Sequence, residues 1–165
     1  MSTPSLERDE VQRAVAQALD LAAFLGASQA EAGASTERGL SVTVRLGEVE
    51  TLEYQQDRGL GITVYVGKRK GSASTADLSE RTVKETVEKA CSIARFTAED
   101  DCAGLADAEM MATDIQDLDL CHPWDIDAEG AIELARACES AGRGVDKRIN
   151  NSEGATISSH RARRV

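Results

Sequence analysis

A run of alternating apolar and polar residues between positions 40 and 75 constrains the fold of this 165-residue chain more than any other feature. Val42, Val44 and Leu46 alternate with polar residues, as expected of a strand with one buried face. Short breaks, each containing glycine, divide this region into several predicted strands. Parallel strands need a long crossover that such breaks cannot hold, so the sequence predicts an antiparallel β-meander.

The meander is predicted to have four or five strands. Four are expected at residues 42–46, 49–54, 60–66 and 71–75, with turns at 47–48, 57–59 and 67–70. The stretch 30–36 can also be extended and would then supply the fifth strand.

Three segments with helical periodicity flank this sheet. The first spans roughly residues 7–25, the second runs from an N-cap at Ser79 to about residue 95, and the third follows an N-cap at Asp127 and breaks near Gly142. The faces predicted to be buried are Val11, Val15, Ala18, Ala22 and Leu25, then Val83, Val87, Ala90 and Ala94, then Ile132, Leu134, Ala135, Cys138 and Ala141.

The last stretch predicts a strand from 147, a turn at 151–154 and another strand to Val165. Because a chain that ends inside an alternating pattern leaves an unpaired edge, we expect a truncated β-hairpin. The predicted fold class is α+β, with residues 1–108 as an N-terminal α+β domain. Residues 109–165 are then an acidic linker, a helix and the start of a second sheet region.

Charge and composition exclude several classes of function. A net charge of −10 disfavours direct binding to nucleic acid. No apolar stretch approaches the roughly 20 residues that cross a bilayer, and the N-terminus lacks a signal peptide. The four cysteines have no metal-ligand or paired spacing and indicate reduced thiols. We therefore expect a cytoplasmic protein without membrane association.

No complete catalytic or metal site is expected within the chain. The only histidines, His122 and His160, lie far apart in sequence, and neither has a second ligand at helical spacing. No serine occupies a nucleophile-elbow motif. The basic cluster that includes Lys68 and Arg69 suits contact with an acidic partner surface, although it is equally typical of a charged hairpin tip.

Several runs of the sequence resemble the N-terminal region of the PmbA (TldE) proteins, a family of modulators of DNA gyrase. The resemblance extends from about residue 20 onward in the family's order. The runs that carry it are 40–50, 59–65, 70–79, 94–97, 101–107, 117–120 and 146–155.

This resemblance implies a role in a metalloprotease made of two kinds of subunit. A TldD-like subunit carries the zinc motif His-Glu-x-x-x-His, and its PmbA-like partner shares the fold without the motif. Together they cleave unfolded or peptide substrates in a closed cavity. The implied cofactor is zinc in the partner and none in this chain, and the implied partners are the TldD-like subunit, peptide substrate and a possible homo-oligomer. The alternative is a non-enzymatic regulator that binds a target such as DNA gyrase.

Under this resemblance, the strand at 71–75 is a candidate contact for substrate or the partner subunit. Unfolded peptides are commonly held by strand addition, in which main-chain hydrogen bonds give affinity without strict sequence preference. Ser72 and Ser74 are the residues expected at this contact, while an exposed polar edge without a binding role would look the same in sequence.

Overall fold

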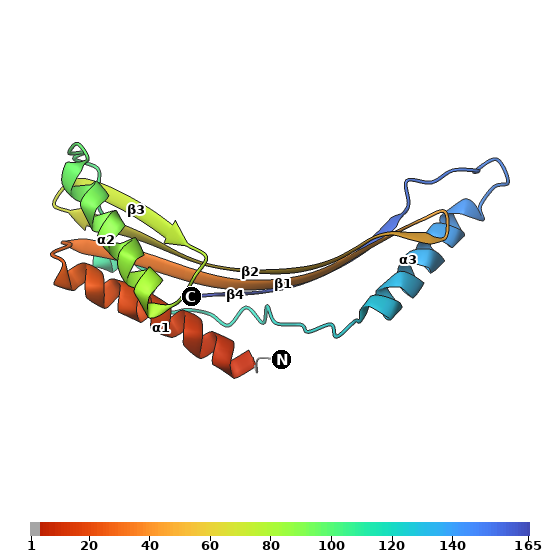
Figure 1. The fold of residues 1–165 in the computed structure, drawn as a ribbon, viewed down its shortest axis with the longest axis horizontal. Helices are drawn as coiled ribbons and strands as arrows, with labels where there is room; N and C mark the ends of the chain where they lie inside the picture. The colour runs from red at the N-terminus through yellow and green to blue at the C-terminus, as the bar shows by residue number, and fades with distance from the viewer. Residues whose placement is uncertain (1–3) are drawn as a thin grey trace. The chain divides into compact units, whose positions relative to one another are not determined.

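The computed structural model describes residues 4–165 and contains one four-stranded sheet and three α-helices (Figure 1). The elements in chain order are α1 (Pro4–Phe24), β1 (Gln29–Arg45), β2 (Glu48–Val66), β3 (Arg69–Thr75), α2 (Glu80–Phe96), the short 3-10 helix η1 (Ala108–Met110), α3 (Ala128–Arg143) and β4 (Ala155–Arg164). The strand order is β3-β2-β1-β4, which confirms the predicted α+β class with an antiparallel sheet flanked by helices. Among the described residues, no helix is both long and apolar enough to span a membrane.

The first two strands are longer than the sequence predicted. The segments 30–36 and 42–46 belong to one strand, β1, and the segments 49–54 and 60–66 belong to one strand, β2. The predicted turn at Asp57-Arg58-Gly59 was therefore wrong. None of these three residues has the positive φ that a tight hairpin turn requires, and strand pairing keeps the backbone extended through them.

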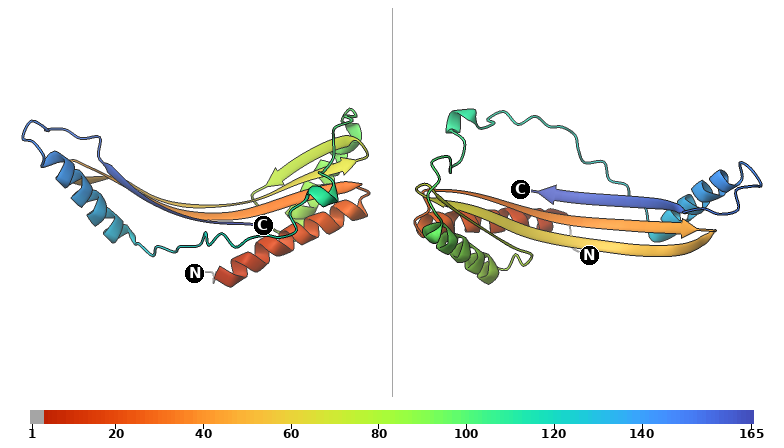
Figure 2. Two further views of the ribbon diagram at one scale, coloured as in Figure 1. Left: turned by 180° about the vertical axis from the view of Figure 1, so that it is seen from behind. Right: turned by 90° about the horizontal axis from the view of Figure 1, so that it is seen from above.

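The terminal strand is confirmed, but its partner is not the hairpin strand that the sequence predicted. β4 pairs with β1 (Figure 2), and hydroxyl pairs join Thr43 to Thr156 (2.9 Å) and Ser41 to Ser158 (3.1 Å). Residues 147–150 form no strand. The backbone N–H of Arg148 instead donates to the side chain of Asp146 (2.8 Å), a local bond that competes with a strand ladder.

The chain divides into two compact units, each with its own apolar core. The first unit contains the residues up to Thr36, Asp57–Leu118 and Arg163–Val165. In it, α1 and α2 cover one face of the sheet and bury the stripes predicted for both helices. The buried strand residues beneath them include Leu60, Ile62 and Val64.

In the first unit, α2 lies against β3 at Gly71. A Cβ atom built on Gly71 would overlap the carbonyl oxygen of Ala90 and the amide nitrogen of Ala94. Glycine is therefore required at this position, because any side chain would push the helix away from the sheet.

The second unit comprises Glu37–Gln56 and Asp119–Ala162. Asp127 caps α3 as predicted, accepting the N–H of Gly130 at 2.8 Å. The buried face of this helix was predicted only in part: Ala135 is buried and Ile132 packs against the core, but Leu134, Cys138 and Ala141 are exposed. The residues that face the sheet are Ala131, Ala135 and Glu139, spaced four apart. This buried face was only partly recognised in the sequence because Glu139 is charged.

Glu139 closes the hairpin between β1 and β2. The turn lies at Leu46-Gly47, one residue earlier than predicted, and both residues have positive φ (53° and 84°), which identifies a type I′ turn. The Glu139 carboxylate accepts the N–H of Leu46 (2.6 Å) and the N–H of Gly47 (2.8 Å). Leucine is unfavourable in this left-handed conformation, so the two bonds stabilise a strained turn.

The same contacts set the ionisation of Glu139. Burial acts to raise the pKa of this carboxyl group, but hydrogen bonds from the N–H groups of Gly47 and Leu46 and from Ser152 outweigh burial. The pKa of Glu139 therefore lies below its ordinary value.

We expect Glu139→Gln to lower the free energy of unfolding at pH 7, because one of the two accepting oxygens becomes an amide nitrogen. The pKa of Glu139 is lower in the folded than in the unfolded chain. Its contribution is therefore complete above the unfolded value of about 4.3 and is lost as the pH falls through the folded value. Urea unfolding at pH 7 and pH 3 should show a difference from the wild type that shrinks at the lower pH.

The matched control is Glu133→Gln, which changes an exposed glutamate of the same helix. This variant should unfold like the wild type at both pH values. A Glu139→Gln deficit of equal size at pH 7 and pH 3 would contradict the assigned role of the ionised carboxylate.

Candidate functional site

The four residues predicted to contact substrate or partner lie on the hairpin that joins β2 to β3. Its loop is Gly67-Lys68, and Val66 pairs with Arg69 directly beyond it. β3 is an outer strand of the sheet, as the strand-addition hypothesis requires. Ser72 and Ser74 are both exposed on it.

The register of this hairpin sets the direction of the β3 backbone groups. Because the loop has two residues, the pair that flanks it exchanges backbone hydrogen bonds, and every second pair along the register does the same. Ser72 and Ser74 fall in the alternate pairs, opposite Thr63 and Gly61. Their N–H and C=O groups therefore point away from β2, toward the open edge. The hydroxyls of Ser72 and Thr63 lie 3.0 Å apart, in keeping with the close side chains of such a pair.

The cationic residues at the hairpin tip contact the chain's own backbone and side chains. Lys68 donates from Nζ to the carbonyl oxygen of Ala103 (3.4 Å). Arg69 donates from Nη1 to the carbonyl oxygen of Arg95 (3.2 Å), and its Nη2 lies 3.2 Å from Oε1 of Glu99. These bonds attach the tip to the last turn of α2 and to the segment after it. A contact of Lys68 or Arg69 with another molecule stays a prediction.

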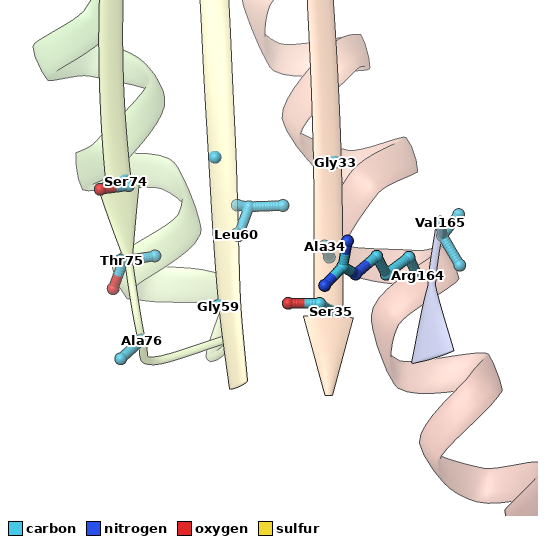
Figure 3. A pocket seen from close by; sticks show the side chains of 11 residues that line it. Gly33, Ala34, Ser35, Gly59, Leu60, Ser74, Thr75, Ala76, Arg164 and Val165 are labelled. Carbon is cyan, nitrogen blue, oxygen red and sulfur yellow. The ribbon is translucent and has the colours of Figure 1, made fainter. Parts of the chain in front are cut away.

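The sheet face opposite α1 and α2 is hollowed beside Ser74. Two adjoining hollows of about 560 and 620 Å³ share Gly33, Gly61 and Ser74 in their walls. Figure 3 shows the first of them, with Ser74 and Thr75 on β3, Gly59 and Leu60 on β2, and Gly33 to Ser35 on β1. The Arg164 side chain lies beside Ala34 and Ser35 in the same view.

Three glycines make this face bare. None of Gly33, Gly59 and Gly61 has positive φ, and a Cβ on Gly61 would meet nothing within 4 Å. A Cβ on Gly59 or Gly33 would be in ordinary contact, 3.6 or 3.4 Å from a carbonyl oxygen. The local fold therefore does not require glycine at 61, in contrast to Gly71. Glycine inside a strand often marks a place where another backbone comes close.

The walls of the two hollows carry groups that can form hydrogen bonds with a ligand. Their walls present hydroxyl groups from Ser35, Thr63, Ser72 and Ser74, without a histidine or lysine to activate them. Glu31 lines one hollow and accepts the Tyr65 hydroxyl at 3.4 Å. Burial, and then the Glu31 charge and hydrogen bond, raise the pKa of Tyr65, which therefore stays a neutral donor.

The two histidines, which are far apart in sequence, line one hollow of the second unit. Sequence spacing gave no sign of this, because His160 lies on β4 and His122 lies in the segment before α3. Within residues 9–165, whose side chains the structure describes, no group of three or more His, Cys, Asp or Glu side chains is arranged to hold a metal ion.

Comparison with known proteins defines the class of this chain. Residues 30–94 match the model of the PmbA/TldA metallopeptidase domain 1. The chain is 49% identical to the Metalloprotease PmbA homolog of Haemophilus influenzae, over 93% of this chain and 34% of that protein. It is 47% identical to Metalloprotease PmbA of Escherichia coli O157:H7, over 97% of this chain and 35% of that protein.

Solved structures share the fold at low sequence identity. A protein of Bacteroides thetaiotaomicron described as a candidate modulator of DNA gyrase superimposes with a TM-score of 0.73 at 22% identity, over 95% of this chain and 36% of that one. TldE of Thermococcus kodakarensis gives a TM-score of 0.65 at 16% identity, over 92% and 37%.

The chain thus carries the first domain of the PmbA/TldD-type metallopeptidases. Within that class it belongs to the PmbA/TldE family, which confirms the resemblance seen in the sequence. It spans about a third of the length of the curated relatives that it matches.

The difference between two glycines of one sheet can be measured. We expect Gly61→Ala to leave the free energy of unfolding unchanged or to raise it by up to about 1 kcal/mol, because the new methyl group enters open space on a less flexible backbone. Gly71→Ala is the matched comparison and should lose about 1–3 kcal/mol by forcing α2 from β3. Urea unfolding of both variants tests this. If both variants lost the same free energy of unfolding, the fold itself would require glycine at position 61.

Proposed function

We propose that this chain is the first-domain region of the non-zinc, PmbA/TldE-like subunit of a TldD/PmbA-type metalloprotease. In this proposal it shapes the substrate cavity and the subunit interface, and the β3 edge holds an unfolded or peptide substrate. The observation that carries the proposal is the outward direction of the Ser72 and Ser74 backbone groups, beside a sheet face cleared of side chains. The names of the relatives at 47–49% identity support the protease class.

The open edge suits a substrate without defined sequence. An extended peptide that pairs with β3 uses its own main chain, so the affinity does not depend on particular side chains. The glycine-lined face next to the edge leaves space for whatever side chains the peptide carries on that side. Hydroxyls along this face can donate to or accept from polar groups of many kinds.

The proposal places the zinc ion in a TldD-like partner subunit. Residues 9–165 offer no group of three or more His, Cys, Asp or Glu side chains arranged to hold a metal ion, and the hollows beside β3 contain no histidine or lysine. The chain's contribution is to hold and orient the peptide while the partner supplies the metal chemistry. A cytoplasmic location of the complex belongs to the same proposal.

The alternative function is regulation by binding alone. The structural neighbour from Bacteroides thetaiotaomicron is described as a candidate modulator of DNA gyrase, and a net charge of −10 suits binding to a basic protein surface. The two functions differ in one measurable property: only the protease depends on a metal ion.

The test uses the full-length protein purified with its TldD-like partner and an unstructured peptide as substrate. We expect a chelator to abolish cleavage. Ser72→Pro/Ser74→Pro should reduce cleavage by at least about tenfold, because proline removes two outward N–H donors of roughly 1 kcal/mol each. The fold should persist, since proline is tolerated where an edge N–H faces solvent.

The matched control is Ser72→Ala/Ser74→Ala, which removes the hydroxyls and keeps the backbone donors. It should cleave at nearly the wild-type rate. Unchanged turnover in the proline variant would refute strand addition at β3, and binding of a target without chelator-sensitive cleavage would favour the regulatory function.

A further inference from the structure

The second unit contains a pocket of about 580 Å³ that the proposed protease role does not use. It is lined by β1 near Gly39, by β4 from Ser158 to Ala162, and by the segment 120–126 that precedes α3. The side chains that give it chemical character are Arg38, His122, Trp124, Asp125, His160 and Arg161. Its volume falls within the range of small-molecule sites, about 300–1,000 Å³.

The position of His160 depends on a glycine in the neighbouring strand. A Cβ atom on Gly39 would lie 2.8 Å from Nδ1 of His160, so any other residue there would displace the imidazole. Gly39 does not have positive φ, and no turn requires a glycine at this point of β1. β1 therefore has no side chain at the position next to the His160 imidazole.

The pocket gathers cationic and N–H-donating side chains in a chain whose net charge is −10. Two arginines and two histidines line it, against one carboxylate, Asp125, whose Oδ1 lies 3.3 Å from Nη2 of Arg161. Outside the lining, Asp119 lies 3.9 Å from Nε2 of His122. A guanidinium group has five N–H donors, so the contact with Asp125 leaves Arg161 able to bind a second acceptor.

Trp124 gives the pocket an aromatic wall. Trp124 is 52% exposed and lines the pocket together with Asp125 and His122. A half-exposed indole beside guanidinium and imidazole groups suits a ligand with an anionic end and an apolar body. Phosphate-rich polymers fit poorly, because the acidic surface of the chain repels them.

We propose that this pocket binds a carboxylate group of a peptide, with Arg161 and His160 as the main donors and Trp124 against the adjoining peptide residue. The proposal takes peptides as ligands from the proposed function, but it needs neither the TldD-like partner nor cleavage. The carboxylate is either the C-terminus of the peptide or an acidic side chain, and the experiment separates these two sources.

Trp124 is the only tryptophan of the 165-residue chain, so its fluorescence reports binding at this pocket directly. The probes are three synthetic peptides with one uncharged sequence: one with a free C-terminus, one amidated, and one amidated with a single internal glutamate. We expect the emission of Trp124 to change on titration with the first or the third peptide and not with the second. The responding peptide identifies the source of the carboxylate.

Arg161→Gln should weaken the response at least about tenfold by removing a charge-assisted hydrogen bond. Gly39→Ala, which displaces His160, should weaken it as well. The matched control is Arg148→Gln, an exposed arginine of the same unit outside the pocket, which should titrate like the wild type. Circular dichroism and thermal unfolding of each variant separate loss of binding from loss of fold.

Equal titration by all three peptides would overturn the proposal, as would an unchanged affinity in a folded Arg161→Gln variant. Saturation by inorganic phosphate together with no response to any peptide would also overturn it. If the assembled protease does not cleave peptides but the pocket still binds a carboxylate, the result would count against the proposed function. The carboxylate-binding role of the pocket would then stand.

Discussion

The two hydrogen bonds from the Leu46-Gly47 turn to the Glu139 carboxylate are the interaction on which the rest of the structure depends. They hold a type I′ turn with leucine in a left-handed conformation that this residue rarely adopts. The turn sets where β1 ends and β2 begins. Since successive side chains of a strand point to opposite faces, a shift of one residue would exchange the buried and the exposed face along a strand.

These two strands contribute to the two apolar cores. β1 supplies Leu40, Val42 and Val44 to the core of the second unit, while β2 supplies Leu60, Ile62 and Val64 to the core of the first. The same alternation leaves Gly61 and Thr63 on the open face beside Ser72. Alternation along β2 thus decides which of its residues remain available for binding on this face.

The sequence predicted those features that depend on local periodicity. Alternation at 60–66 and 71–75 was enough to place Ser72 and Ser74 on a strand, and the stripes of α1 and α2 followed from their helical spacing. The break expected at Asp57-Arg58-Gly59 failed because strand pairing overrides turn-forming residues. The α3 face was predicted only in part because its buried Glu139 finds hydrogen-bond partners only in the folded hairpin.

The hollows could not be predicted from the sequence, for a related reason. The sequence predicted Gly59 in a turn and Gly61 on a strand, and only the sheet shows that both are strand positions without a side chain beside the hollows. His122 and His160 line one pocket because β4 pairs with β1, and no local sequence pattern predicts that pairing. Contacts between distant segments are decided by packing, so a site built from them appears only with the fold.

The free edge of β3 has a consequence for the solubility of the protein. Outward N–H and C=O groups on an exposed strand are a template for any extended chain, including a second copy of the same strand, and such edges promote aggregation. The residues along this edge are small and polar, and Lys70 adds a positive charge that repels an identical edge. The charge of Lys70 therefore opposes self-assembly of this strand into larger sheets.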